Sequence, residues 1–375
     1  MMKLLIIAGF AESIVPFRGA LIEELKKAGC EVHIAAPGVK SLAQIGSKLG
    51  LSPDRIHEVP MARAGTNPWS DLKSFFSLYQ LMRAIRPDVV LPYTIKPVVY
   101  GILAACLAHV PRRYALVTGL GYAFSDDRTG AALRIVRFLY GLALARATKV
   151  FFQNPDDDQL LREIGILPSE VPSVVVNGSG VDVSAFAVVP LPPPPLSFLM
   201  IARLLGDKGV REYAESARRI RMTNPDIVFR LVGWVDENPD TVSQVELDGW
   251  IDSGHIEFLG KLSDVRPAIA NSTVYVLPSY YREGTPRTVL EALAMGRPVI
   301  TTNAPGCRET VVDGENGFLV PIKSTDALVL AMKKFINEPM LATRMGERSR
   351  QIAEEKYDVR KVNAVMLREM GISAS

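Results

Sequence analysis

Cysteine, histidine and long apolar runs are all scarce in this chain of 375 residues. Its three cysteines (Cys30, Cys106 and Cys307) are far apart and form no C-x-x-C pair. This usage is typical of reduced, packed thiols in a cytosolic protein and argues against a disulfide framework or a zinc site. No G-x-G-x-x-G motif follows the first expected strand, which weakens a dinucleotide-binding interpretation. No apolar run approaches the roughly 18 residues of a spanning helix, so we expect none.

The composition is instead that of a chain with a large α/β core. Hydrophobic residues make up 48% of it and the net charge is only +3, which predicts two α/β domains and not a disordered or histone-like chain. The apolar start at 4–8 is short and enters a loop and a helix, which predicts a buried strand and not a signal peptide. The proline-rich segment 189–196 predicts a stiff linker between a first domain, 1–188, and a second domain, 197–354.

A strand, a short polar loop and a helix are expected between residues 274 and 296. Val274–Leu277 is β-branched and apolar enough to be a buried strand. After the loop, Thr285 can be the N-cap of a helix and Pro286 its first residue, because proline has no N–H to leave unpaired there. The helix is expected to run through Met295 and to end at Gly296. Such an arrangement presents helix-terminal N–H groups to an anion.

Two carboxylates, Glu283 and Glu291, lie on this unit with an E-x7-E spacing. Glu283 lies just ahead of the helix, where a bound phosphate or sugar would rest. Glu291 lies inside the helix among apolar neighbours, so we expect it to be half-buried and to need a hydrogen-bond donor. A ribose diol would supply one. Arg287, one helical turn earlier, is the alternative donor.

The second expected domain also begins with a strand that is followed by basic residues. Ser197–Ile201 predicts the strand, and Arg203 and Lys208 lie in the loop after it. Arginine can bind a diphosphate with two parallel hydrogen bonds, and lysine can bind it as a point charge. The sequence therefore indicates a diphosphate clamp, with a pair of solvated surface cations as the alternative.

Three motifs together resemble the donor site of glycosyltransferase family 4. They are Glu283-Gly-Thr-Pro-Arg-Thr-Val-Leu-Glu291-Ala, Gly296-Arg-Pro-Val-Ile and Glu309-x4-Gly314-x-Asn316-Gly-Phe-Leu-Val-Pro321. Almost the whole chain is similar to this family, and most similar to bacterial undecaprenyl-diphosphate-sugar N-acetylhexosaminyltransferases of the bacillosamine-extending type. The resemblance implies the α/β GT-B fold, in which two Rossmann-like domains face each other across a cleft. It also implies that a C-terminal helix, here 355–375, crosses back to the first domain.

The same resemblance implies a retaining, metal-independent hexosyltransferase with a UDP-sugar donor and a polyprenyl-diphosphate-linked acceptor. Glu283 would orient the donor sugar, and Lys208 and Arg203 would neutralise charge on the departing diphosphate, so these three are the expected catalytic residues. The other donor-binding residues would be Glu291, Gly284, Thr285, Pro286, Arg287, Thr288, Gly233 and Lys261. No Asp-x-Asp lies in a suitable strand-end loop, so we expect no metal ion and no other cofactor.

On the acceptor side, the resemblance points to loops of the first domain. It assigns Ser13, Phe17, Arg18, Lys96, Thr118, Gly119 and Asn177. The first three lie in the predicted loop 9–18, before an expected helix at 20–27, and packing of Phe17 on that helix is the alternative. Lys96 follows an expected strand at an edge where open α/β sheets bind ligands, with a solvated surface lysine as the alternative.

Positive charge is concentrated in the first domain. Residues 61–150 carry twelve Lys or Arg against four Asp or Glu, a net charge of +8. Within them, 69–86 and 131–149 interleave basic with aromatic and aliphatic residues, which is typical of helices that dock on anionic lipid. A core helix with solvated arginines is the alternative for 131–149. We therefore expect a peripheral protein on the cytoplasmic face of the inner membrane. No nucleic-acid-binding motif accompanies the charge, so we expect no nucleic acid partner.

The sequence does not identify a general base. None of the four histidines falls at an expected cleft loop, and Thr118-Gly119 lies in about the region of the family's usual catalytic histidine. The E-x7-E carboxylates are not a glycosidase pair, because Glu291 would face the nucleotide and not the scissile bond. Two other functions are open, a GT-B nucleotide-sugar epimerase or hydrolase and a non-catalytic membrane scaffold. The lack of cleft histidines argues against the first, and Arg203, Lys208 and Glu283 together argue against the second.

Overall fold

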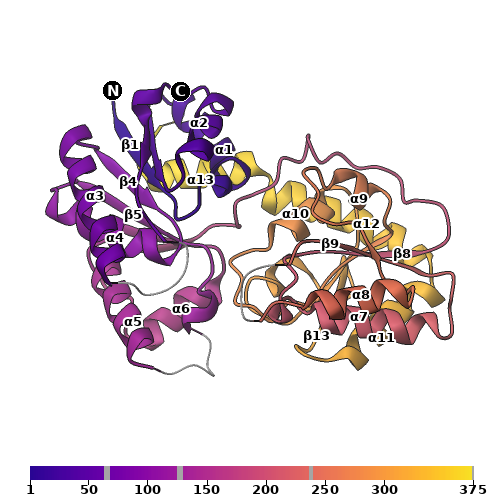
Figure 1. Ribbon diagram of the computed structural model, residues 1–375. Coiled ribbons are helices and arrows are strands. Elements are labelled where there is room, and N and C mark those ends of the chain that lie inside the picture. The colour runs from indigo at the N-terminus through magenta and orange to yellow at the C-terminus, as the bar shows by residue number, and fades with distance from the viewer. Residues whose placement is uncertain (63–67, 125–129, 236–239, 374–375) are drawn as a thin grey trace. The chain divides into compact units, whose positions relative to one another are not determined.

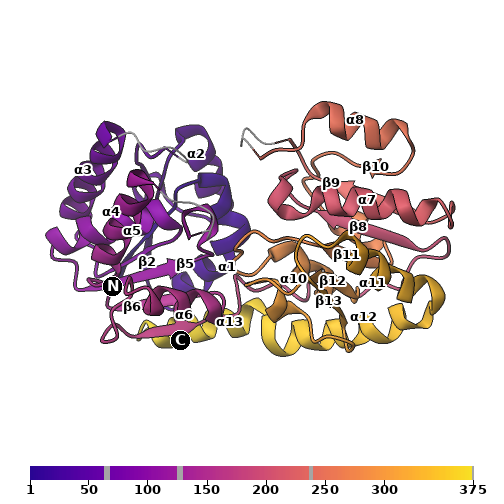
Figure 2. The same cartoon turned by 90° about the horizontal axis from the view of Figure 1, so that it is seen from below.

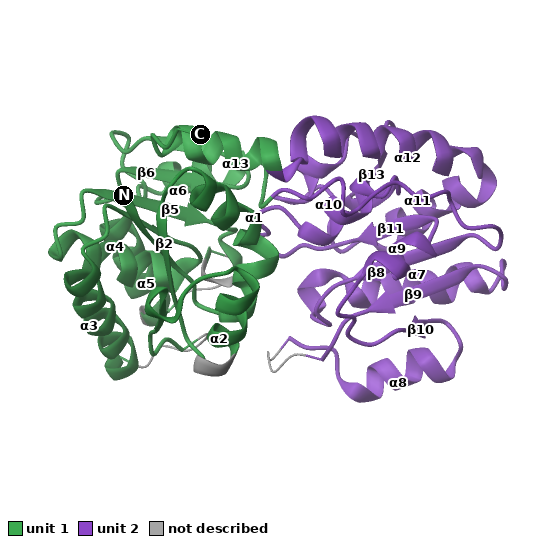
Figure 3. Cartoon of the chain, turned by 90° about the horizontal axis from the view of Figure 1, so that it is seen from above, with its two compact units in different colours: residues 1–179, 360–375 green, residues 180–359 purple. Residues whose placement is uncertain are grey.

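The computed structural model describes residues 1–62, 68–124, 130–235 and 240–373. The chain forms two compact units (Figure 3). Unit 1 is Met1–Ser179 together with Arg360–Ser375, and unit 2 is Gly180–Val359. Each unit has its own parallel sheet with helices on both faces (Figure 1).

Unit 1 is built on a seven-stranded sheet in the order β3-β2-β1-β4-β5-β6-β7. The strands are β1 (Lys3–Ile7), β2 (Glu31–Ala36), β3 (Ile56–Glu58), β4 (Val89–Pro92), β5 (Arg112–Val117), β6 (Lys149–Phe152) and β7 (Ser173–Val175). Successive side chains of β1 point to opposite faces, so Leu4 and Ile6 pack in one core and Leu5 and Ile7 in the other. The strand order reverses between β1 and β4, which makes their carboxyl ends the topological switch point.

The helices of unit 1 cover both faces of this sheet. They are α1 (Ile14–Lys27), α2 (Val39–Lys48), α3 (Pro68–Ile85), α4 (Ile95–Leu107), α5 (Ala131–Leu144), α6 (Pro155–Glu163) and the C-terminal α13 (Val359–Glu369). α4 packs between α3 and α5 on one face (Figure 1). α13 adds Met366 and Leu367 to the core on the other face. Within the described parts of the chain, no helix is both long and apolar enough to cross a bilayer.

Unit 2 is built on a six-stranded sheet in the order β10-β9-β8-β11-β12-β13. The strands are β8 (Ser197–Ile201), β9 (Val228–Val232), β10 (Glu257–Phe258), β11 (Val274–Leu277), β12 (Val299–Thr302) and β13 (Gly317–Val320). The helices are α7 (Val210–Arg221), α8 (Gln244–Asp252), α9 (Arg266–Ala270), α10 (Arg287–Ala294), α11 (Thr325–Asn337) and α12 (Met340–Ile352). The strand order reverses between β8 and β11, so this unit also has a switch point.

Two helix starts differ from the predicted ones. α1 begins at Ile14, so Phe17 and Arg18 belong to a helix and not to a loop. Pro16 is tolerated in the first turn, because the N–H that it lacks would have no helical partner there. α10 begins at Arg287 with Pro286 as its N-cap, and not with Thr285, because the backbone of Pro286 is still extended at ψ 114°.

The basic segment 131–149 is not one helix. α5 ends at Leu144, and Lys149 is the first residue of β6. The Nζ of Lys149 forms an ion pair with Glu369 of α13 at 2.8 Å, so this lysine holds the C-terminal helix to the sheet. The prediction missed the break because the apolar residues on both sides of it suit a helix and a buried strand equally well.

The boundary between the two units lies before the proline segment 189–196, which was predicted to be the linker. The two units divide after Ser179, because the residues that follow already pack on unit 2. Val183 lies in the core of that unit. The guanidinium of Arg297, which is 1% exposed, donates to the carbonyl of Val189 at 2.9 Å. The linker is therefore fastened to unit 2 over its first residues and is not a free spacer.

Candidate functional site

The switch point of unit 2 brings together two charged side chains that are 75 residues apart in sequence. Lys208 lies in the turn after β8, and Glu283 lies in the loop after β11; the two strands are neighbours in the sheet (Figure 2). Lys208 is 8% exposed, and its Nζ forms an ion pair with Glu283 Oε1. Open α/β sheets bind ligands at such a point, so the structure places this pair where a ligand is expected.

Hydrogen bonds fasten these two loops to each other. The carbonyl of Asp207 accepts from the amides of Tyr280 at 2.9 Å and Tyr281 at 3.0 Å. Ser279 Oγ lies 3.3 Å from the same carbonyl. The ring of Tyr281 has its centroid 4.5 Å from Lys208 Nζ, a distance at which the cation is attracted to the ring face. The pair is thus held by the loop structure and not only by two flexible side chains.

Two glycines permit the close approach of backbone segments at this edge. Gly209 follows Lys208 with φ +76°, and a Cβ there would lie 2.3 Å from the carbonyl oxygen of Pro278. Gly306 has φ +82°, and a Cβ there would lie 2.3 Å from the carbonyl oxygen of Gly284. Only glycine adopts these angles readily and leaves room for the opposite chain. Substitution at either position would push the loop of Glu283 away from its neighbours.

The predicted clamp residue Arg203 lies earlier in the loop of Lys208. Burial raises the pKa of Asp207, and the positive charges of Lys208 and Arg203 oppose that rise. Both cations therefore act on one carboxyl group in this loop. Because two cations and a helix N-terminus at α7 lie together, the arrangement can neutralise the charge of a diphosphate.

Glu291 and Arg287 form an ion pair on α10, with 2.7 Å between Glu291 Oε1 and Arg287 Nε. The pairing with Arg287 that the sequence offered as the alternative is thus present in the ligand-free chain. Glu291 is 6% exposed, and burial raises its pKa even though Arg287 opposes the shift. Burial thus disfavours the charged form of Glu291. Carboxyl groups with a pKa shifted in this way are frequent at binding sites.

The remaining predicted donor residues of unit 2 lie on neighbouring strand ends. Gly233 N donates to Gly260 O at 2.9 Å, which joins the loops after β9 and β10. Lys261 Nζ lies 4.9 Å from the ring centroid of Trp234, which is 40% exposed at the end of β9. Sequence reasoning did not select Trp234, although its place directly after Gly233 could have identified it.

Two threonines near the start of α10 were predicted donor residues. Thr285 is buried, and Thr288 forms hydrogen bonds within unit 2. The hydroxyl oxygen of Tyr275 lies 2.6 Å from Thr288 Oγ1, to which it can donate, and 3.2 Å from the carbonyl oxygen of Ile201. Thr288 thus ties α10 to β8 and β11. Its role in donor binding stays a prediction. Gly284 and Pro286 supply backbone to the same loop, and Gly284 faces Gly306 closely.

The switch point of unit 1 has a cluster of different chemistry. The guanidinium of Arg18 lies 5.1 Å from the ring centroid of Tyr93, and Tyr93 Oη shares a hydrogen bond with Ser13 Oγ at 2.8 Å. Burial raises the pKa of Tyr93 to about 12. The next residue, Thr94, has φ +69°, a strained conformation that costs roughly 1–3 kcal/mol and that gathers at functional sites. Tyr93 was missed as a site residue, although it directly follows β4.

The other predicted acceptor residues do not all join this cluster. Lys96 lies in the first turn of α4 and not in a loop, and its Nζ pairs with Asp71 of α3 at 2.9 Å. Phe17 is 40% exposed on α1. Thr118 and Gly119 follow β5, where Gly119 has φ +101°, and Asn177 follows β7. In residues 1–62, 68–124, 130–235 and 240–373, no three His, Cys, Asp or Glu side chains are grouped to hold a metal ion.

Two family models match the chain, one for each half. The model described as "Glycosyl transferases group 1" matches residues 184–352, and the model described as "Glycosyl transferase 4-like" matches residues 5–154. The first range contains the Lys208–Glu283 pair and Glu291. The second contains Ser13, Arg18 and Tyr93.

Similar proteins include an N,N'-diacetylbacillosaminyl-diphospho-undecaprenol alpha-1,3-N-acetylgalactosaminyltransferase of Campylobacter jejuni, 30% identical over an alignment of 363 positions that covers 92% of each chain. A UDP-Gal:alpha-D-GlcNAc-diphosphoundecaprenol alpha-1,3-galactosyltransferase of Escherichia coli is 29% identical over an alignment of 285 positions that covers 72% of each chain. Among solved structures, Anabaena Alr3699/HepE in complex with UDP and glucose superposes with a TM-score of 0.79 and 17% identity, covering 99% of this chain and 100% of the other. This similarity to a solved structure over nearly the whole chain shows that the fold is GT-B.

Proposed function

This chain belongs to glycosyltransferase family 4, and from that premise we propose that it moves a sugar, an N-acetylhexosamine, from a UDP-sugar to a polyprenyl-diphosphate-linked saccharide. The observation that carries the proposal is the buried Lys208–Glu283 pair at the switch point of unit 2. It supplies a cation for a diphosphate and a carboxylate for sugar hydroxyls on one pair of neighbouring loops. The activity belongs to the assembly of bacterial surface or protein glycans.

The donor half of the reaction would use the residues of unit 2. Lys208 and Arg203 would neutralise charge on the departing diphosphate, assisted by the N-terminus of α7. Glu283 would accept hydrogen bonds from hydroxyls of the donor sugar, and Glu291 would hold the ribose. The leaving group and the incoming hydroxyl would occupy the same face of the sugar, so that the anomeric configuration is retained without a metal ion.

The acceptor half would use unit 1 and the membrane surface. The relatives from Campylobacter jejuni and Escherichia coli are named for acceptors on undecaprenol diphosphate, which supports an acceptor of this class. Ser13 and Arg18, with Tyr93, would face it. The exposed side chains on α3 and α5 support a peripheral position on anionic inner-membrane lipid, because Trp69 and Phe138 are 81% and 69% exposed near Lys73 and Arg134. Of the charges counted in 61–150, those of Arg63, Asp126, Asp127 and Arg128 lie outside the described residues.

A donor screen tests this proposal. Purified protein would be given UDP-GlcNAc, UDP-GalNAc, UDP-glucose, UDP-galactose or GDP-mannose together with an undecaprenyl-diphosphate-linked N-acetylhexosamine. We expect release of UDP and one extended lipid-linked product from a UDP-N-acetylhexosamine. Transfer from GDP-mannose alone, or isomerisation of a UDP-sugar without transfer, would contradict the proposal.

A flotation assay tests the membrane position. Reversal of Arg134 and Arg137 to Glu should weaken binding to vesicles that contain anionic lipid, because each basic residue near such a surface contributes about 1 kcal/mol. The matched control reverses the exposed Lys333 and Arg344 of unit 2, with the same change of charge. We expect transfer to a long-chain acceptor to slow in the first variant and transfer to a short, soluble acceptor to change far less. Equal loss of binding in both variants would mean that net charge alone decides it.

A further inference from the structure

Ser279 contacts Glu283 of the Lys208–Glu283 pair and is fully buried. It follows Pro278, at the end of β11. Its hydroxyl oxygen lies 3.2 Å from Glu283 Oε1 and 3.3 Å from the carbonyl oxygen of Asp207, and it accepts from the amide of Tyr281 at 3.3 Å. A serine hydroxyl has one proton to donate, so it can serve only one of the two oxygens fully at a time.

The backbone of Ser279 is held from the neighbouring strand. The hydroxyl of Thr302, the last residue of β12, donates a hydrogen bond to the carbonyl of Ser279. Ser279 is thus fixed by β12 on one side and by the Lys208 loop on the other. Its hydroxyl can rotate, but its position cannot change without moving two loops.

Binding of a diphosphate changes what Glu283 needs. In the ligand-free chain the carboxylate is paired with Lys208. When the ammonium of Lys208 turns to a phosphate, Glu283 loses a charged donor in a site that is only slightly exposed. The loss of a charged donor is costly for a carboxylate in such a place, and it removes one contact that fixes the orientation of Oε1.

The proton of Ser279 can compensate for that loss at little cost elsewhere. If it turns to Glu283 Oε1, the carbonyl of Asp207 still accepts from the amides of Tyr280 at 2.9 Å and Tyr281 at 3.0 Å. The carbonyl therefore stays satisfied in both arrangements. The carboxylate, by contrast, has Ser279 as a neighbouring donor that does not depend on the ligand.

We propose that Ser279 is a positioning residue: it holds Glu283 Oε1 once Lys208 has moved from Glu283 to the donor diphosphate, and so keeps the carboxylate in the orientation that a sugar hydroxyl requires. The proposal rests on the proposed function, because it assumes a donor with a diphosphate and a sugar. It treats the Lys208–Glu283 ion pair as the resting arrangement, which the donor exchanges for two separate contacts. Ser279 itself touches neither the nucleotide nor the sugar.

The test compares Ser279→Ala with Thr301→Val. Thr301 is also fully buried, on β12, and its hydroxyl donates to the carbonyl of Leu277 at 2.7 Å. Each variant thus loses one buried hydroxyl at the same edge of the sheet, but only one of them loses a donor to Glu283. We expect Ser279→Ala to lower kcat with the UDP-sugar by about 10- to 100-fold, the usual effect of losing a hydrogen bond to a charged group. The dissociation constant of UDP alone should change by less than about twofold, because UDP carries no sugar for Glu283 to orient.

The control and the melting temperature separate positioning from folding. Thr301→Val should keep kcat within about threefold of wild type at a similar melting temperature. If Ser279→Ala melts far below wild type, Ser279→Cys decides, since its thiol is a weak donor of similar size and should also lower kcat and spare UDP binding. Unchanged kcat in the serine variants, an equal loss of kcat and UDP affinity, or an equal loss in Thr301→Val would overturn the proposal. Wild-type protein that binds no UDP and uses no donor would overturn the proposed function itself.

Discussion

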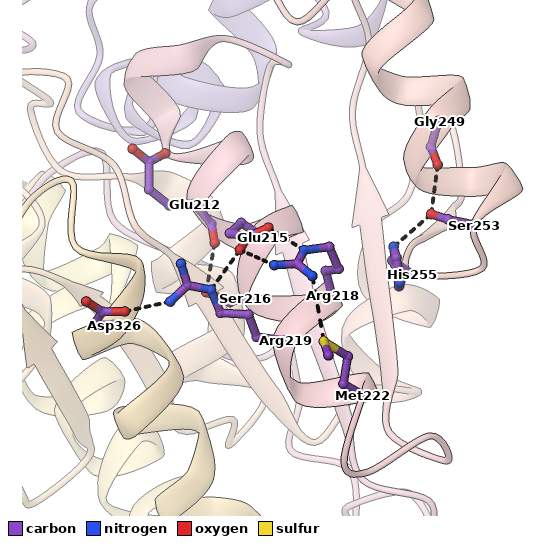
Figure 4. A network of polar contacts seen from close by, with 10 residues as sticks. All are labelled: Glu212, Glu215, Ser216, Arg218, Arg219, Met222, Gly249, Ser253, His255 and Asp326. Atoms are coloured by element: carbon purple, nitrogen blue, oxygen red, sulfur yellow. Dashed lines mark hydrogen bonds and ion pairs between the residues drawn. The ribbon is translucent and has the colours of Figure 1, made fainter.

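Two of the ion-pair groups in unit 2 join basic side chains to carboxylates in opposite surroundings. At the carboxyl edge of the sheet, Lys208 and Glu283 pair with side chains 10% and 14% exposed. On α7, Glu215 accepts from Arg218 and Arg219, and Arg219 continues to Asp326, whose side chain is 87% exposed (Figure 4). The first group joins two loops, whereas the second lies mainly along the outer surface of one helix.

The difference in exposure separates charges that contribute a little to stability from charges that suit a ligand. An exposed network gains little, because water and salt screen it and long side chains must be ordered to form it. A buried pair pays a desolvation cost that an apolar pair would avoid, so its retention at a switch point suggests a use for the separated charges. The following predictions test this contrast.

The largest effect is expected from the clamp. Lys208→Ala and Arg203→Ala should each lower turnover by two or more orders of magnitude, since losing a charge that stabilises a departing diphosphate costs about 3 kcal/mol. Both variants should remain folded by circular dichroism. Arg218→Ala on α7 is the matched control and should keep turnover within about twofold. Near-normal turnover in both clamp variants, or an equal loss in Arg218→Ala, would remove the distinction between the two groups of charges.

Glu291→Gln should separate stability from binding. Burial raises the pKa of Glu291, so the folded state holds a proton that the unfolded state releases, and the wild type loses stability as pH rises above the unfolded pKa of about 4.3. The glutamine variant lacks this loss, so its melting temperature relative to wild type should be higher at pH 7 than at pH 4. UDP affinity should fall by roughly tenfold, the effect of losing a charged hydrogen-bond acceptor. A variant that binds UDP normally would show that Glu291 serves only Arg287.

A smaller effect is expected from Glu215→Gln. Hydrogen bonds from Arg218 and then Arg219 lower the pKa of Glu215 to about 2, so its contribution to stability is present above the unfolded pKa and is lost as pH falls toward 2. A third of the Glu215 side chain is exposed. We therefore expect the substitution to lower the free energy of unfolding at pH 7 by at most about 1 kcal/mol. Urea unfolding at pH 7 and pH 3 would measure it, and the difference from wild type should shrink at the lower pH. Turnover should not change.

Chelation should have the smallest effect. Since Lys208 and Arg203 are proposed to neutralise the diphosphate, transfer in excess EDTA should equal transfer in buffer with Mg²⁺. The rate of UDP release measures this directly. A rate abolished by EDTA and restored by Mg²⁺ or Mn²⁺ would mean that a metal ion supplies the charge instead.

Much of the secondary structure followed from local patterns. Ser197–Ile201 and Val274–Leu277 are strands with the predicted bounds, because short apolar runs between polar or glycine-rich turns suit a buried parallel sheet. Asn154 caps α6 through its side chain, which accepts from the amide of Asp157 at 2.8 Å, a local interaction that an Asn-Pro-Asp sequence favours. The predicted stop of α10 is also confirmed, since Gly296 has φ +72°.

Errors arose where two local preferences compete. Pro16 suggested a loop, but a proline within the first helical turn is compatible with α1, so Phe17 and Arg18 were placed in the wrong element. Lys149 suited the amphipathic pattern of the preceding helix but belongs to β6, because Glu369 and the neighbouring strand hold it there. Such outcomes depend on partners that are distant in sequence.

The sequence by itself determined the two α/β units and the strand-loop-helix around Glu283 and Glu291, and it suggested the diphosphate clamp of Arg203 and Lys208, because each of these depends on neighbours within a short segment. Only the tertiary structure decided that Lys208 pairs with Glu283, that the Ser279 hydroxyl contacts Glu283 and that Tyr93 contacts Arg18 and Ser13. The physical reason is the order of strands in each sheet. It brings together the carboxyl ends of β8 and β11, and of β1 and β4, and no local pattern of residues specifies that order.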